Sequence, residues 1–349
     1  MATDLLPTNR KYLGSKRHLA PRFCDRICAR GVPESLLDGF CGTGAIAVEM
    51  ARRGTGALTG IDTLLSNTLV LAAYFSPVVR HERVAVAELI EQLGRAEPRN
   101  GYVTDAFGDR YFTLDNARRI DAARAVISGW HAAAAHHPEL IDATLGALLL
   151  AADRVANCIG QYDAYLKHLG SDAYQDGRHL VDSRVYGALQ LVPVASSAGS
   201  PATVRVVTAD INEVIAHVDV EIAYFDPPYN GRQYSDNYHV LESIARWDDA
   251  PVYGKTRKAR RPLLKSAFSR RREVEAALRR LLQGCRARRI YLSYSSEGLL
   301  GENELWPLLR EFGSVERFSF DYPVFGNGAG VARRRQVVEH LYELQPHAA

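Results

Sequence analysis

The sequence has no hydrophobic run long enough to cross a membrane and no secretory leader pattern. Its longest apolar stretch covers residues 145–152, whereas a transmembrane helix needs about 20 apolar residues. The first residues are polar and are interrupted by Pro7 and Gly14, unlike the apolar core of a signal peptide. We therefore expect a soluble, cytoplasmic protein without a membrane partner.

Cysteine is also scarce. The five cysteines are an odd number at irregular spacing, which argues against a disulfide framework. Cys24 and Cys28 could share a metal ion across one helical turn, but no second Cys/His pair at zinc-like spacing accompanies them. We expect buried, reduced thiols and no metal site.

Neither sign of charge dominates the chain. It has 43 Lys and Arg against 40 Asp and Glu, a formal net charge of +3. Any contact with nucleic acid must therefore depend on a local basic patch and not on the overall charge. With 349 residues, 47% of them hydrophobic, the chain can form one large domain or two modest ones, each with its own core.

Strands and helices alternate in the first and last parts of the chain. The pattern predicts strands over 36–40, 57–61, 204–208, 220–225 and 290–293, with helices over 45–53 and 63–75. This alternation is typical of an α/β fold with a doubly wound, mostly parallel sheet. Two late stretches, 315–320 and 336–344, predict a terminal hairpin.

The middle of the chain lacks this alternation. Between residues 96 and 195 the pattern predicts helices over 116–135 and 140–158 but no strand, and a linker rich in Ser, Gly and Pro follows. We therefore predict an inserted, mainly helical domain at 96–195. The larger domain would then consist of residues 1–95 and 196–349.

The first chemical motif is a glycine turn after the first predicted strand. The turn contains Asp38, Phe40, Gly42 and Gly44. Glycines between a strand and a helix let a ligand approach the backbone and leave helix N–H groups available. Asp62 ends the next predicted strand, 18 residues beyond Gly44, where a carboxylate suits hydrogen bonds to ribose hydroxyls. This pattern alone fits either a nucleotide-like ligand or a plain tight turn.

The second motif is Asp226-Pro227-Pro228-Tyr229, which directly follows a predicted strand. The two prolines remove two backbone donors and stiffen the turn. We expect the carbonyls of Asp226 and Pro227 to point outward beside a carboxylate at the C-terminal edge of the sheet, where α/β folds bind ligands. A simple strand end explains this motif poorly.

Together the two motifs resemble the D12 class of DNA adenine-N6 methyltransferases, the Dam-like enzymes. Residues 11–17 (Lys-Tyr-Leu-Gly-Ser-Lys-Arg), residues 162–167 (Tyr-Asp-Ala-Tyr-Leu-Lys) and Asp210 after a strand resemble the same class. The motif order, with the inserted domain between glycine turn and Asp-Pro-Pro-Tyr, resembles the alpha arrangement. The resemblance implies a seven-stranded methyltransferase sheet, S-adenosyl-L-methionine as methyl donor, double-stranded DNA as substrate, and a target-recognition role for residues 96–195.

The resemblance also implies roles for individual residues. Catalytic roles fall to Asp226, Pro227 and Tyr229, and cofactor-binding roles to Tyr12, Lys16, Asp38, Phe40, Gly42, Gly44, Asp62 and Asp210. The N6 amine is a poor nucleophile because its lone pair is delocalised. Two acceptors that take both of its N–H hydrogens aim the lone pair at an electrophile. Tyr229 is expected to stack on an adenine flipped out of the duplex.

A basic run follows the second motif. Residues 255–272 contain nine Lys and Arg and no acidic residue. Such a run can be a solvated face, but beside a nucleic-acid motif it favours a loop that contacts phosphates. The residues predicted to bind DNA are Arg257, Lys258, Arg260 and Arg261. A Gly- and Arg-rich stretch at 325–335 suggests a loop near the active-site rim, without an assigned role.

Three alternatives stay open on the sequence alone: an adenine-N6 methyltransferase of RNA, a catalytically silent DNA-binding protein, and a cytosine-N4 enzyme. The chain has none of the short RNA-binding signatures, and the intact Asp-Pro-Pro-Tyr motif argues against lost catalysis. By the same resemblance, cytosine-N4 enzymes usually carry Ser where Asp226 stands. We expect a monomer or weak dimer in a restriction-modification setting, with a cognate restriction endonuclease as a candidate partner.

Overall fold

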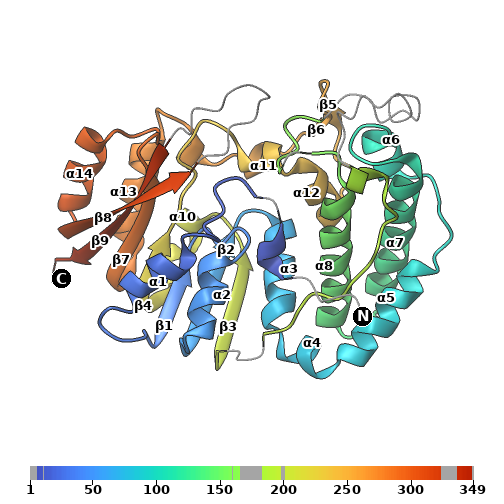
Figure 1. Cartoon of the computed structure of the whole chain (residues 1–349), viewed down its shortest axis with the longest axis horizontal. Helices are drawn as coiled ribbons and strands as arrows, with labels where there is room; N and C mark the ends of the chain where they lie inside the picture. Colours follow the sequence, from blue (N-terminus) through green and yellow to red (C-terminus); the bar gives the residue numbers. More distant parts are fainter. Residues whose placement is uncertain are drawn as a thin grey trace.

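A computed structural model describes residues 6–10, 12–158, 160–165, 183–197, 201–323 and 336–347. Seven strands form one sheet, and a bundle of helices stands beside it (Figure 1). The strands of the sheet are β1 Ser35–Asp38, β2 Ala57–Asp62, β3 Thr203–Thr208, β4 Asp219–Phe225, β7 Arg286–Ser295, β8 Gly313–Pro323 and β9 Gln336–Pro346. Within the described ranges, no helix is both long and apolar enough to span a membrane.

The order of strands in the sheet is β3-β2-β1-β4-β7-β9-β8. The first five of these strands run parallel to one another, whereas β9 is antiparallel to both β7 and β8. The predicted doubly wound, mostly parallel sheet of seven strands and its terminal hairpin are therefore confirmed. The position of β9 between β7 and β8 was not predicted, and it places β9 beside β7, one strand in from the edge of the sheet.

Two apolar cores cover the two faces of the sheet, and successive residues of a strand pack into different cores. Leu36 and Tyr224 pack with α1 Ala20–Ile27, α2 Ala45–Arg52 and α3 Leu65–Phe75. Leu37 and Phe225 pack with α10 Ile211–Val214, α13 Val274–Gly284 and α14 Glu302–Arg310. The alternation follows from the pleat of a strand, which sends successive side chains to opposite faces. Because these strands are buried on both faces, their carboxyl ends are held rigidly. The candidate site lies at those ends.

The helical region consists mainly of four helices, α5 Arg83–Gly94, α6 Tyr102–Phe107, α7 Leu114–Ala133 and α8 Pro138–Val155. Two long helices were predicted here, and α7 and α8 confirm them. Thr113 caps α7 by accepting from the N–H of Asn116, and Pro138 starts α8. The core of α8 is continuous with that of α3 beside the sheet. The domain limits at residues 95 and 196 therefore stay a prediction.

Candidate active site

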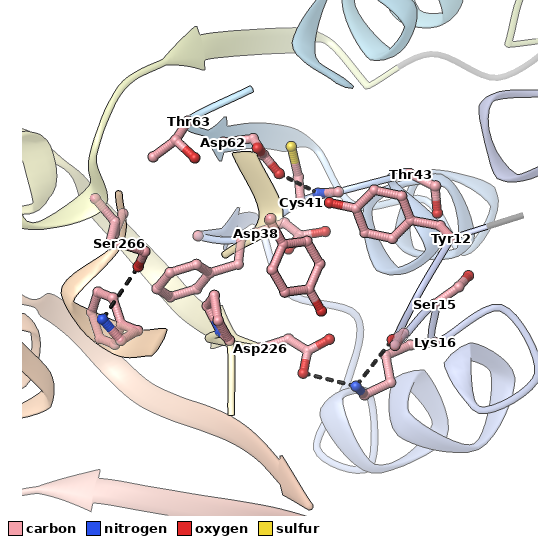
Figure 2. Close-up of a pocket in the computed structure, with 18 of the residues that line it drawn as sticks. Tyr12, Ser15, Lys16, Asp38, Cys41, Thr43, Asp62, Thr63, Asp226 and Ser266 are labelled. Atoms are coloured by element: carbon pink, nitrogen blue, oxygen red, sulfur yellow. Dashed lines mark hydrogen bonds and ion pairs between the residues drawn. The ribbon is translucent and has the colours of Figure 1, made fainter. Parts of the chain in front are cut away.

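A cavity that opens to solvent lies at the carboxyl ends of β1, β2 and β4 (Figure 2). Most of the residues selected from the sequence line it: Tyr12, Lys16, Asp38, Phe40, Gly42, Asp62, Asp210 and Asp226. Segments far apart in the chain thus meet in one place, as the resemblance implied. Pro227 is buried and Tyr229 lies beside Lys16, while Gly44 is not among the described residues that line the cavity.

The glycine turn forms one wall of the cavity. Gly42 and Gly44 have φ angles of 50° and 73°, in the left-handed region that side chains rarely adopt. A Cβ on Gly42 would lie 3.2 Å from Cε1 of Tyr12, so the turn and the Tyr12 ring are in close contact. A Cβ on Gly44 would lie 2.4 Å from Cδ1 of Leu71, which places this glycine against α3 and not against the cavity.

Asp62, at the end of β2, holds the turn in place. Its Oδ2 accepts from the N–H of Gly42 at 2.8 Å and from Nδ2 of Asn67 at 3.2 Å. Its Oδ1 accepts from the N–H of Leu64 at 2.8 Å. Burial raises the pKa of Asp62 to about 6, although these three donors oppose the shift. A carboxylate oxygen accepts about two hydrogen bonds, so Oδ1 retains capacity for a further donor.

Asp38, at the end of β1, carries a buried acceptor with spare capacity. The residue is only 2% exposed, and its Oδ1 has no hydrogen-bond partner among the described residues. Burial, followed by the charge of Asp226, raises the pKa of Asp38 to about 8. An unsatisfied buried oxygen costs free energy, and a donor in the cavity would remove that cost.

Asp226 forms the opposite corner and pairs with Lys16. Nζ of Lys16 lies 2.8 Å from Oδ1 of Asp226 and 3.4 Å from Oε1 of Glu339. Burial raises the pKa of Asp226 to about 6, against the opposing charge of Lys16. Although burial lowers the pKa of Lys16, the two carboxylates raise it well above the ordinary value. Lys16 therefore stays an ammonium group at neutral pH.

Glu339 was not predicted as part of the site. It lies on β9, and its Oε1 accepts from Oγ of Ser293 on β7 at 2.6 Å. No motif surrounds it in the sequence, and only the insertion of β9 beside β7 brings it to Lys16. Sequence analysis could have placed Glu339 in the site only if it had predicted that β9 pairs with β7.

Aromatic side chains support the N-terminal motif. Tyr12 stacks on Tyr238, with ring centroids 4.3 Å apart and planes 10° from parallel. The hydroxyl of Tyr238 accepts from the N–H of Leu13 at 2.6 Å, and the hydroxyl of Tyr234 donates to the Leu13 carbonyl at 3.2 Å. These tyrosines on α11 Tyr234–Asn237 and near α12 His239–Arg246 fix residues 12–16 against the site. Sequence analysis did not single them out.

Tyr229 lies next to the ion pair of Lys16 and Asp226, and its predicted stacking on a base stays a prediction. Its ring centroid is 5.2 Å from Nζ of Lys16, and its ring meets that of Tyr294 edge-on at 6.1 Å. The carbonyl of Tyr229 accepts from the N–H of Leu299 at 2.8 Å. The end of the Asp-Pro-Pro-Tyr segment is thereby fixed to the loop after β7.

The predicted DNA-binding residues lie in or directly after a small hairpin, β5 Val252–Tyr253 and β6 Lys258–Ala259, beside α12 (Figure 1). Arg257 is in its turn with a φ of 52°, and the guanidinium of Arg260 lies 5.3 Å from the centroid of the Tyr253 ring. Lys258 pairs with Asp163, which belongs to the predicted 162–167 segment. Leu166 and Lys167 of that segment lie outside the described residues, as does the whole 325–335 stretch.

Arg261 is held differently from its neighbours. It bonds Asp248 at 2.6 Å and 3.0 Å and donates to Oγ of Ser243 at 3.0 Å. Its side chain is only 8% exposed. The guanidinium therefore ties the hairpin to the end of α12, and its predicted contact with DNA stays a prediction.

A family model of the D12 class N6 adenine-specific DNA methyltransferases matches residues 12–295. The chain belongs to this family. The methyltransferase is thus an enzyme that acts on the N6 position of adenine in DNA, and the resemblance drawn from its two motifs is confirmed. The matched range includes the glycine turn, the helical region and Asp-Pro-Pro-Tyr.

Several curated proteins are similar to this methyltransferase. It is 30% identical to the type II methyltransferase M.NlaIII of Neisseria lactamica over 331 residues, which are 90% of this chain and 92% of that protein. It is 37% identical to M.FokI of Planomicrobium okeanokoites over 60% of this chain but only 30% of that protein. Modification methylase StsI of Streptococcus sanguinis is 26% identical over 96% of this chain and 52% of that protein.

Proposed function

We propose that this methyltransferase transfers a methyl group from S-adenosylmethionine to an adenine flipped out of a specific DNA site. The observation that carries the proposal is the position of Asp226, which directly follows β4 and lines a cavity whose other wall is the glycine turn. The side of the cavity formed by the glycine turn would bind a nucleoside, and the side formed by Asp226 provides a carboxylate that can accept hydrogen bonds. The two reactants can then meet between them.

The residues of the cavity fit this cofactor. When bound, S-adenosylmethionine supplies a methyl group already activated on a sulfonium. Oδ1 of Asp62 has capacity left for a ribose hydroxyl, and Oδ1 of Asp38 is an unsatisfied buried acceptor suited to the ammonium of the methionine part. Tyr12, Phe40 and Asp210 line the same cavity. By resemblance, Asp210 would accept from the cofactor's adenine.

Asp226 and the carbonyl of Pro227 would accept the two hydrogens of the N6 amine. Such fixed acceptors stabilise the positive charge that develops on nitrogen during transfer. Tyr229 would stack on the flipped base, an interaction of about 1–3 kcal/mol, which offsets part of the few kcal/mol needed to unstack it. The protein thus mainly orients two partners and excludes water.

The hairpin β5–β6 would contact phosphates through Arg257 and Arg260. Replacing both by alanine is expected to weaken binding to every DNA sequence and to reduce the slope of log K against log salt by about 2, because two phosphate contacts are lost. A filter-binding series at several salt concentrations measures this. Lys258 and Arg261 are left unchanged because their ion pairs hold the hairpin itself.

A matched control lies at the other end of the sheet. Arg286 and Arg288 are exposed near the start of β7, at the edge opposite the carboxyl ends of the parallel strands. Alanine at both positions removes the same charge but is expected to leave the salt slope unchanged. Equal slopes for the two double variants would remove the hairpin from the DNA interface.

The setting that we propose is restriction and modification. M.NlaIII and M.FokI are described as type II methyltransferases, and StsI as a modification methylase. A cognate endonuclease of the same DNA site is accordingly the expected partner. Protection of host DNA from such an enzyme would be the consequence of methylation.

Expression in a host free of DNA methylation, followed by long-read mapping of N6-methyladenine, tests the proposal. We expect one short sequence to be methylated almost completely. Matched DNA and RNA oligonucleotides, incubated with tritiated S-adenosylmethionine, are expected to show transfer to DNA only. Transfer to RNA alone, or no transfer to either, would overturn the proposed function.

A further inference from the structure

The ammonium group of Lys16 stands between two buried carboxylates. Figure 2 shows it paired with Asp226 at the cavity, and Glu339 lies 3.4 Å away from the same Nζ. The side chains of Lys16 and Glu339 are each 6% exposed, and that of Asp226 is 16% exposed. Charges removed from water in this way are costly unless each is paired, so the cluster requires an explanation.

Glu339 itself does not line the cavity within the described part of the chain. It is opposite Ser295 in the register of β7 and β9, and Ser293 donates to its Oε1 at 2.6 Å. The backbone of two paired strands and one hydrogen bond therefore fix the carboxylate behind Lys16. Glu339 is therefore placed to act through its contact with Lys16.

The charges of the cluster do not cancel. Lys16 alone would neutralise Asp226, the group that faces the reacting atoms. With Glu339 included, one positive and two negative charges leave these three groups with a net charge of −1. A charge in a buried site acts over several ångströms because screening by water is weak there.

We propose that Glu339 is a positioning residue that compensates Lys16, so that the corner around Asp226 stays net negative toward the cationic centre of methyl transfer. The inference depends on the proposed function. The lone pair of the N6 amine forms the bond to the methyl carbon while the carbon–sulfur bond breaks and its electron pair goes to sulfur. Positive charge then lies on N6 until the surplus proton passes to water. Both reactant and transition state are cationic beside Asp226, whereas the thioether product is neutral.

Replacing Glu339 by glutamine tests the charge while keeping the shape. The amide oxygen can still accept from Ser293, but the net charge of the corner rises to zero. We expect binding of S-adenosylmethionine, measured by calorimetry, to weaken about tenfold, the equivalent of about 1.4 kcal/mol. Binding of the neutral S-adenosylhomocysteine should change less than about twofold. Equal changes for both ligands, or none, would overturn the inference.

The dependence of kcat/KM on pH gives a second readout. It would not change if Glu339 had a purely structural role. Asp226 acts as a carboxylate, so kcat/KM falls at low pH as that group is protonated. The groups that face Asp226 are Lys16 before α1, Asp38 on β1, Tyr224 on β4, Tyr234 on α11 and Glu339 on β9. Glu339 raises the pKa of Asp226, so E339Q should shift the acid limb to lower pH. An unmoved limb contradicts the proposal.

Glu343 provides the matched control. It lies four residues along β9, pairs with Arg30 at 3.4 Å and is not among the described residues of the cavity. Glu343→Gln makes the same chemical change on the same face of the strand. It is expected to leave both the preference for the sulfonium ligand and the acid limb as in the wild type.

A double variant restores the net charge and covers the case in which E339Q folds poorly. Lys16→Gln with Glu339→Gln leaves Asp226 as the one charge of the three, again a net −1. The ratio of the two dissociation constants should return to within about twofold of the wild type. If the ratio in the double variant stays equal to that in the E339Q variant, the result contradicts charge compensation. Failure of the wild type to bind the sulfonium or to methylate DNA would instead refute the proposed function.

Discussion

Replacing Asp226 by alanine is expected to lower kcat for methyl transfer by about a hundred- to a thousandfold while the protein stays folded. The variant loses an acceptor aimed at the charge that develops on N6, and such contacts contribute a few kcal/mol each. Every 1.36 kcal/mol corresponds to a factor of ten in rate. Lys16 keeps Glu339 as a partner at 3.4 Å, so the substitution does not leave a buried charge alone.

Transfer of tritium from labelled cofactor to DNA measures this effect, and circular dichroism reports the fold. Asp219→Ala is the matched control, because Asp219 begins the same strand, is exposed and lies at the opposite edge of the sheet. The control should retain nearly full activity. Residual activity above about a tenth in Asp226→Ala, with the fold intact, would contradict the role of Asp226 as acceptor.

The second large effect concerns stability. Gly44→Ala is expected to lower the free energy of unfolding by about 2–6 kcal/mol. The backbone at φ 73° costs about 1–3 kcal/mol for a residue with a Cβ, and the new methyl would lie 2.4 Å from Cδ1 of Leu71. Leu71 is only 1% exposed in the core, so it cannot move aside without overpacking, which costs a further 1–3 kcal/mol or so.

Gly54→Ala separates the two contributions. Gly54 has a φ of 95°, but a Cβ there would meet nothing within 4 Å, so only the backbone cost of about 1–3 kcal/mol applies. Denaturant unfolding of both variants gives the difference. The double variant Gly44→Ala with Leu71→Ala should lose less stability than the sum of the singles, because the clash disappears. Equal destabilisation by the two glycine variants would show that Leu71 plays no part.

The parts of the site that sequence analysis predicted are those that depend on neighbouring residues. The glycine turn follows β1 directly, and β2 is the next strand along the chain. The contact between Gly42 and Asp62 therefore joins the ends of two strands that are consecutive in the sequence and adjacent in the sheet. Asp-Pro-Pro-Tyr is also local, because its prolines fix the backbone wherever the strand ends. The seven strands likewise followed from alternation along the chain.

The parts that were missed depend on contacts between distant segments. The pairing of Lys16 with Glu339 requires β9 to insert beside β7, and no local pattern specifies that choice. The basic run at 255–272 is evident in the sequence, but the partners of Arg261 and Lys258 lie on other segments. Gly44 was selected for the cofactor, whereas its close neighbour is Leu71 on α3. Its role toward the cofactor stays a prediction.

The position of Glu339 also has a consequence for synthesis of the chain. Lys16 leaves the ribosome early, Asp226 follows much later, and Glu339 emerges only with the strand that completes the sheet. Until β9 inserts next to β7, the carboxyl that flanks the ammonium is missing from the growing polypeptide. The charged corner therefore forms late in biogenesis, and we expect the chain to become active only after β9 has left the ribosome and paired with β7.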